Sequence, residues 1–320
     1  EALELRDRGT VLVEEIGERV DELLTRDPHP LFARHLRTTK AITRTGWIRA
    51  ELLMAEDPET ARQAVKFLGR IRDGLLGDAG QWDSYAAGRR SLVLGVSARV
   101  DKSLQPYSLR LPRDWDPERS YPLMIYLHGY VPDPSQLWYI NWSFSPHAPR
   151  ANPEVEELEP YIMVAPWGHG NAGYTVSGEA DLWTALRDAK EICKADPDRM
   201  MLTGHSMGGY GTWSIALRTP DRWAAIAIYS GGPYPGELPL AGNLAHMPVL
   251  LWHGAQDDVV PPERMFAIRD ALKAVGNDPQ VFLHEDAKHM VPRGVRLPHR
   301  KWLLEQRRER PDRFSFIEDR

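Results

Sequence analysis

Apolar positions in the first part of the chain recur every three to four residues, which is the spacing of an amphipathic helix. Residues 2–26 carry one such helical face, formed by Leu5, Leu12, Ile16, Val20 and Leu23. A second helical pattern covers residues 29–57, where we expect a break near Gly46, and a third covers residues 57–77. Together they predict a helical appendage of about three helices over residues 1–85.

Beyond this appendage, short apolar runs alternate with helical patterns. The runs, which are typical of strands, cover residues 89–101, 105–112, 123–129, 161–167, 199–206, 223–232, 248–258 and 280–287. Helical patterns cover residues 179–195, 208–220, 261–276 and 297–310. Because strands alternate with helices, we expect an α/β domain over residues 86–310, with a mostly parallel central sheet flanked by helices.

The composition is that of an ordinary folded protein. Of the 320 residues, 42% are hydrophobic and 27% are charged. The net charge of -5 and the isoelectric point near 6.2 give no electrostatic reason to expect nucleic acid or a membrane as a partner. A neutral or weakly polar small molecule fits this balance better.

Cysteine content and hydropathy restrict the setting of the protein further. Cys193 is the single cysteine, which excludes an intramolecular disulfide and a multi-cysteine metal site. No apolar stretch approaches the roughly 20 residues that cross a bilayer. Because the chain begins at Glu1, we expect either a cytoplasmic protein or one exported with its signal peptide removed.

The segment GHSMG at residues 204–208 matches the pattern G-x-S-x-G. It follows an apolar run and opens a helical pattern, which is the context that this motif requires. The chain must turn sharply from strand to helix, so side chains at Gly204 and Gly208 would clash. A helix N-terminus also favours negative charge that develops beside the serine. This setting predicts an α/β-hydrolase fold with Ser206 as nucleophile.

An acid is expected next along the chain, because the partners in this fold follow in the order serine, acid, histidine. The apolar run 248–258 ends in a loop that carries Asp257 and Asp258. This loop follows the carboxyl end of a strand, where the active sites of α/β sheets collect. One of the two aspartates would orient the base and stabilise its charged form, and position alone leaves the choice open.

Three histidines downstream are candidates for the base that a serine nucleophile needs. His284 lies inside an apolar run and is expected to be structural, and His299 lies at a helix start and is expected at the surface. His289 lies in the loop that follows the last strand, where its imidazole could reach Ser206. The sequence therefore favours His289 as the general base.

Two main-chain N–H groups are expected to stabilise the oxyanion of an acyl-transfer reaction. One belongs to Met207, directly after the nucleophile, and the other to Tyr130, in the loop after the strand at 123–129. His128 in the same loop is expected to shape the turn.

Aromatic side chains crowd two loop-like segments near the predicted site. Trp138, Trp142 and Trp167 are candidates for a substrate pocket, and His205 beside the nucleophile is counted with them. Ordinary packing between loops and sheet is the alternative explanation. Neither aromatic segment has the spacing of metal ligands, and no glycine-rich phosphate cradle is visible, so we expect no metal and no cofactor.

Three segments together resemble a branch of esterases related to prolyl oligopeptidase catalytic domains and to feruloyl and acetyl-xylan esterases. They are PYSLRLPRDWDPERSYPLMIYLHGY, GHSMGGYGTWSIALRTPDRWAAIAIYSGG and HGAQDDVVPPE. The resemblance covers about residues 100–305 and leaves the N-terminal helices out. It implies that the acid of the family falls on Asp257, within the pattern His253-Gly254-x-x-Asp257, and that its histidine falls on His289.

The expected function is hydrolysis of a small or carbohydrate-linked carboxylic ester through an acyl-enzyme. A serine peptidase that acts on short peptides would share the same triad, and a non-catalytic binding module could use the same fold. The N-terminal helices are expected to form an oligomer contact or a pocket wall. These alternatives differ in substrate and partner, which the motifs leave open.

Overall fold

The computed structural model describes residues 2–77, 91–112, 115–131, 158, 160–292, 294–308 and 316–317. The chain divides into two compact units. The first comprises Glu1–Trp115 with Val131–Asn152, and the second comprises Asp116–Tyr130 with Pro153–Arg320. The domain boundary expected at residue 85 lies outside the described residues and stays a prediction.

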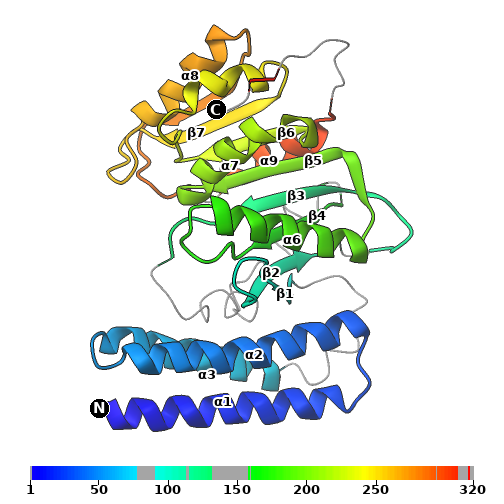
Figure 1. The fold of residues 1–320 in the computed structure, drawn as a ribbon, viewed down its shortest axis with the longest axis vertical. Helices are drawn as coiled ribbons and strands as arrows, with labels where there is room; N and C mark the ends of the chain where they lie inside the picture. Colours follow the sequence, from blue (N-terminus) through cyan, green and yellow to red (C-terminus); the bar gives the residue numbers. More distant parts are fainter. Residues whose placement is uncertain are drawn as a thin grey trace. The chain divides into compact units, whose positions relative to one another are not determined.

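The first unit begins with three consecutive helices, α1 (Ala2–Leu24), α2 (Pro30–Leu53) and α3 (Pro58–Gly77) (Figure 1). Each of them contacts the other two. The apolar face expected on the first helix is buried at Leu12, Ile16, Val20 and Leu23, where it joins the core of this unit. The predicted break near Gly46 is wrong, because α2 continues through it. Gly46 has a low helix propensity, and the close packing of its neighbour Trp47 against Gly9 of α1 offsets that cost.

Local hydrogen bonds explain two further features of this unit. Asp57 begins α3, since its carboxylate accepts the N–H groups of Glu59 and Thr60. Strands β1 (Ser91–Ser97) and β2 (Leu104–Arg110) form an antiparallel pair. The buried imidazole of His35 on α2 accepts the N–H of Val93 at 3.0 Å, which joins the hairpin to the helices.

The second unit contains the parallel sheet that the sequence predicts. Its strands follow the order β4-β3-β5-β6-β7-β8 (Figure 1), and each adjacent pair is parallel. They are β3 (Tyr121–Leu127), β4 (Ile162–Pro166), β5 (Ala195–His205), β6 (Ala225–Tyr229), β7 (Val249–Gly254) and β8 (Gln280–His284). Every residue of β6 and β7 is buried, as continuous apolar strands in a covered sheet should be. The carboxyl ends of all these strands meet at one edge.

Helices flank this sheet. They are α6 (Val176–Ile192), α7 (Met207–Arg218), α8 (Glu263–Ala274) and α9 (Arg296–Glu305), with 3-10 turns at Pro220–Arg222 and Leu238–Leu244. Leu303 and Leu304 of α9 pack on the sheet face that carries Met124 and Met201. Helix α7 packs along β3, β5 and β6. Among the helices that the structure describes, none has an apolar stretch able to cross a membrane.

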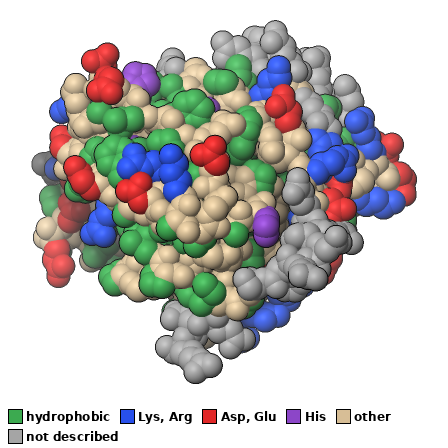
Figure 2. Space-filling model, turned by 90° about the horizontal axis from the view of Figure 1, so that it is seen from above, with side chains coloured by type: hydrophobic (Ala, Val, Ile, Leu, Met, Phe, Trp, Pro, Cys, Tyr) green, Lys and Arg blue, Asp and Glu red, His purple; other side chains and the backbone are tan. Residues whose placement is uncertain are grey.

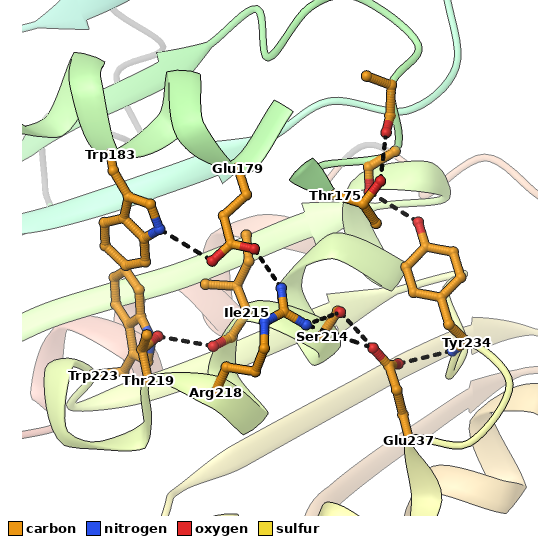
Figure 3. Close-up of polar contacts among 12 residues, drawn as sticks. Thr175, Glu179, Trp183, Ser214, Ile215, Arg218, Thr219, Trp223, Tyr234 and Glu237 are labelled. Atoms are coloured by element: carbon orange, nitrogen blue, oxygen red, sulfur yellow. Dashed lines mark hydrogen bonds and ion pairs between the residues drawn. The ribbon is translucent and has the colours of Figure 1, made fainter. Parts of the chain in front are cut away.

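A polar network joins α6, α7 and the segment after β6 (Figure 3). The buried carboxylate of Glu237 accepts the hydroxyl of Ser214 and, at 2.8 Å, the N–H of Tyr234. Arg218 donates to Ser214 at 2.6 Å and to Glu179 at 2.5 Å. Because Glu237 is nearly enclosed, these bonds compensate its desolvation and hold the segment after β6 in place.

Candidate active site

The turn at residues 204–208 has the geometry of a nucleophile elbow. Strand β5 ends at His205, Ser206 has a positive φ of 56°, and α7 begins at the next residue. A Cβ atom on Gly204 would lie 2.1 Å from the Gly208 oxygen, and one on Gly208 would lie 2.1 Å from the Leu127 oxygen. Only glycine fits both positions, so the strained serine is held between the sheet and the helix.

Three polar side chains converge at the carboxyl edge of the sheet. The Nε2 atom of His289 lies 2.9 Å from Ser206 Oγ, and its Nδ1 atom lies 2.8 and 3.0 Å from the two carboxylate oxygens of Asp257. A carboxylate only accepts hydrogen bonds, so Nδ1 carries the proton and Nε2 is left to accept from the serine hydroxyl. This arrangement can remove a proton from Ser206.

Asp257 is the better supported of the two aspartates. Its side chain is 0% exposed, whereas that of Asp258 is 66% exposed and lies 3.5 Å from the Lys288 ammonium. The Asp257 carboxylate also accepts the N–H groups of Val259 and Val260 at 3.0 and 2.9 Å. Burial raises the pKa of Asp257, but hydrogen bonds to the carboxylate outweigh burial and hold this pKa below its ordinary value.

The loop that carries His289 is tied down through its main chain. The His289 oxygen lies 2.9 Å from Nε2 of His205 and accepts the Ser230 hydroxyl at 3.0 Å. Burial lowers the pKa of His205 to about 4, and the positive charge of Arg296 adds to this effect. His205 is therefore neutral near pH 7, with its proton on Nε2 directed at the His289 oxygen.

The turn after β3 lies directly against the elbow. A Cβ atom on Gly129 would lie 3.3 Å from Ser206 Cβ and 3.3 Å from the His205 oxygen. Because Gly129 directly precedes Tyr130, this contact brings that part of the main chain close to Ser206. Met207 is the first residue of α7, where N–H groups have no acceptor within the helix. The two N–H groups expected to bind an oxyanion thus lie on segments that flank Ser206.

Comparison with known proteins agrees with this geometry. Residues 170–292, which include Ser206, Asp257 and His289, match the dienelactone hydrolase family. A thermostable esterase of known structure superposes on 69% of this chain and 64% of its own, with a TM-score of 0.53 and 23% identity. The CE1 ferulic acid esterase of Anaeromyces mucronatus covers 68% of this chain and 90% of its own, with a TM-score of 0.53 and 16% identity.

This chain is an α/β-hydrolase by fold. In sequence it is 23% identical over 242 residues to dipeptidyl-peptidase 5 of Porphyromonas gingivalis, which covers 60% of this chain. The chain spans about a third of that relative, since the match covers 34% of it. The relatives include esterases and peptidases, so the comparisons support a hydrolase and leave its substrate open.

Two of the four residues expected to bind substrate can be located in this α/β-hydrolase. Trp167 is buried and stacks on the ring of His128, with 5.1 Å between the ring centroids, and the ring of His205 supports the His289 loop. Trp138 and Trp142 lie outside the described residues. Within the described part of the chain, no group of three or more His, Cys, Asp or Glu side chains could hold a metal ion.

The sequence misplaced one histidine and missed two supporting residues. His299 was expected at the surface, but it is buried between Tyr229 and Phe282, because α9 turns this position toward the sheet. His253 is also buried, with Nε2 3.2 Å from the Asp257 carboxylate. The pattern His253-Gly254-x-x-Asp257 was a signal for that contact, whereas nothing local marked Ser230 as a partner of the His289 loop.

Proposed function

We propose that this protein is a serine carboxylic-ester hydrolase that acts through an acyl-enzyme. The observation that carries the proposal is the 2.9 Å contact between His289 Nε2 and Ser206 Oγ, with Nδ1 bonded to the buried Asp257. A serine hydroxyl is a weak nucleophile at neutral pH, and an imidazole oriented by a carboxylate activates it. The proposed catalytic residues are therefore Ser206, His289 and Asp257.

In the first half of the proposed reaction, Ser206 Oγ attacks the ester carbonyl carbon while its proton passes to His289 Nε2. The negative charge on the carbonyl oxygen is bound by the N–H groups of Met207 and Tyr130. The tetrahedral intermediate then collapses and breaks its bond to the alkoxy oxygen. His289 gives its proton to that oxygen, so that an alcohol leaves and an acyl-Ser206 remains.

In the second half, water replaces the alcohol. His289 takes a proton from the water as its oxygen attacks the acyl carbon, and the same N–H groups bind the second oxyanion. Collapse breaks the bond to Ser206 Oγ, which recovers the proton from His289. The carboxylic acid leaves, and Asp257 stays ionised throughout because its hydrogen bonds favour the charged form.

Surface chemistry near these residues favours a neutral substrate. Exposed apolar side chains lie on the segments that carry the site, namely Tyr130, Val259 and Met290. Figure 2 shows one face of the molecule, seen from above the view of Figure 1, where acidic and basic side chains are interspersed without one sign of charge dominating. The exposed apolar side chains beside the site segments, together with the esterases among the structural relatives, support a small or carbohydrate-linked ester.

A peptidase acting on short peptides is the second candidate, because dipeptidyl-peptidase 5 is among the relatives. Both reactions use the same triad and differ in the leaving group. Parallel assays with an acyl nitrophenyl ester and an aminoacyl anilide would separate them. Ester turnover without detectable anilide turnover supports the proposal, and turnover of the anilide favours the peptidase.

The central test is the variant Ser206→Ala. We expect it to abolish hydrolysis of a short-chain nitrophenyl ester and labelling by a fluorophosphonate probe, while its unfolding temperature stays close to that of the wild-type protein. Turnover that persists in the variant would refute the assignment of the nucleophile. A wild-type protein that neither labels nor hydrolyses esters would instead favour a binding module on a hydrolase fold.

The N-terminal helices are expected to form an oligomer contact or a pocket wall. Light scattering would test the oligomer contact.

A further inference from the structure

Tyr174 lies beneath the turn that carries the proposed oxyanion donor. Its side chain is fully buried, and its hydroxyl makes two hydrogen bonds to described residues, one as acceptor and one as donor. It accepts the N–H of His128 at 3.0 Å and donates to the Pro166 oxygen at 3.2 Å. Since β3 ends at Leu127 and β4 ends at Pro166, this single hydroxyl joins the carboxyl ends of two neighbouring strands.

The ring of Tyr174 also contacts the nucleophile helix. A Cβ atom on Gly211 of α7 would lie 2.7 Å from Tyr174 Cβ, so the helix approaches the tyrosine closely. Tyr174 has a positive φ of 55°, which is unfavourable for a bulky residue and persists only where surrounding contacts enforce it. The tyrosine is thus packed between α7 and the turn after β3.

A second tie holds the same turn. The ring of His128 contacts the Trp167 oxygen through Nε2 at 3.0 Å and the Gly129 oxygen through Nδ1 at 2.7 Å. It also packs edge-on against the Tyr174 ring, with 5.6 Å between centroids. On one side, this turn is therefore held by the loop after β4. On the other side, Gly129 of the same turn lies against the elbow at Ser206.

We propose that Tyr174 is a positioning residue. It holds the main chain at His128–Tyr130 in place beside Ser206, so that the N–H group of Tyr130 meets the developing oxyanion. This inference rests on the proposed function. Small displacements of such a donor are costly, because the electrostatic stabilisation of an oxyanion depends on preorganised geometry. Tyr174 acts through the turn and does not touch the substrate.

The variant Tyr174→Phe tests the inference by removing only the hydroxyl. Tyr121→Phe is a matched control, because Tyr121 is also buried and its hydroxyl accepts a main-chain N–H, that of Asp116, at 3.0 Å. It lies at the opposite end of β3 from His128. A purely structural role predicts that both variants lose thermal stability and activity to a similar degree.

We expect Tyr174→Phe to lower kcat by about 10-fold or more with little change in KM, which is less than the 10²–10³ typical for outright loss of a donor. The pH profile of kcat/KM should keep its shape, because the triad is intact. Tyr121→Phe should keep kcat within about twofold. Equal kcat in Tyr174→Phe and wild type, or an equal loss in both variants, would overturn the inference.

The rate of Ser206 labelling by a fluorophosphonate probe gives a readout that does not depend on the natural substrate. Ser206 Oγ passes its proton to His289 Nε2 and attacks phosphorus, fluoride leaves, and the phosphoryl oxygen takes the position of the oxyanion. We expect slower labelling in Tyr174→Phe alone. Slower labelling in a protein without ester turnover would support the inference while the esterase proposal fails. Equal labelling rates would overturn the inference and leave the esterase proposal standing, and a wild-type protein that does not label would overturn both.

Discussion

The ring of His205, directly before the candidate nucleophile, lies 2.9 Å from the main-chain oxygen of His289, the candidate base. The elbow therefore supports the loop that carries its own partner. Ser230 donates its hydroxyl to the same oxygen from the end of β6. The ends of β5 and β6 thus hold the main chain of His289, and with it the base of its imidazole.

This relationship predicts that His205→Phe lowers kcat by about 10-fold, because a ring of similar size remains but its N–H donor is lost. Steady-state kinetics on a nitrophenyl ester would measure the loss. His246→Phe, at an exposed position, is the control and should leave kcat unchanged. Because His205 and Ser230 share one acceptor, adding Ser230→Ala should give a non-additive effect, with a coupling of about 0.5–3 kcal/mol. Strict additivity would contradict the shared anchor.

Substitution of the two adjacent aspartates should have unequal effects. Asp257→Asn should lower kcat by about 10⁴-fold, because the amide can donate to His289 Nδ1 and so favours the wrong tautomer. Asp258→Asn should change kcat by less than about threefold, since its exposed side chain contacts only the Lys288 ammonium among the interactions described. Comparable losses in the two variants would mean that the acid has been assigned wrongly.

The buried His205 should make folding stability depend on pH. Its ordinary pKa is 6.5 and burial lowers it to about 4, so the unfolded chain binds a proton in this interval that the folded chain does not. The contribution of His205 to the free energy of unfolding is complete above pH 6.5. It is lost as the pH falls toward 4, which lowers that free energy by up to about 3 kcal/mol. Denaturant unfolding at several pH values should show a shallower loss over this window for His205→Phe. An unchanged slope would count against a buried neutral ring.

The close approach at the elbow predicts a strong effect of a single methyl group. In Gly208→Ala the added Cβ would lie 2.1 Å from the Leu127 oxygen, so β3 and α7 must separate. We expect a loss of about 1–3 kcal/mol in the free energy of unfolding, together with most of the activity. Gly69→Ala is the contrasting case. Gly69 lies on helix α3, and a Cβ atom added there would meet no neighbouring atom within 4 Å. This substitution should stabilise the protein by about 0.5–1 kcal/mol, because alanine has the higher helix propensity.

Elements whose signal is local were predictable from the sequence. The 3.6-residue period identified the apolar face of α1, and Asp57-Pro58 identified the start of α3. Continuous apolar runs identified strands of the parallel sheet, as for β7, which ends at Gly254. The break expected at Gly46 failed because packing against a neighbouring helix outweighed a local propensity of about 1 kcal/mol.

The candidate site was predictable where chain order and motif carry the information. Gly204, Ser206 and Gly208 form a local turn, and the order serine, acid, histidine narrowed the later partners to a few residues. His299 was misjudged because its burial depends on which face of α9 meets the sheet. That orientation is set by contacts that are distant in sequence.

The sequence by itself determined the strand–turn–helix motif around Ser206, since the requirement for glycine arises within five consecutive residues. The position of Asp257 and Asp258 in the chain left the acid open, and the family resemblance favoured Asp257. The tertiary structure supplied the physical difference, because it buries the Asp257 side chain and leaves that of Asp258 exposed. It also brought Tyr174 beneath the turn at His128 and His205 against the loop of His289. These contacts join residues 46 and 84 positions apart, and they exist only because parallel strands bring their carboxyl ends to one edge.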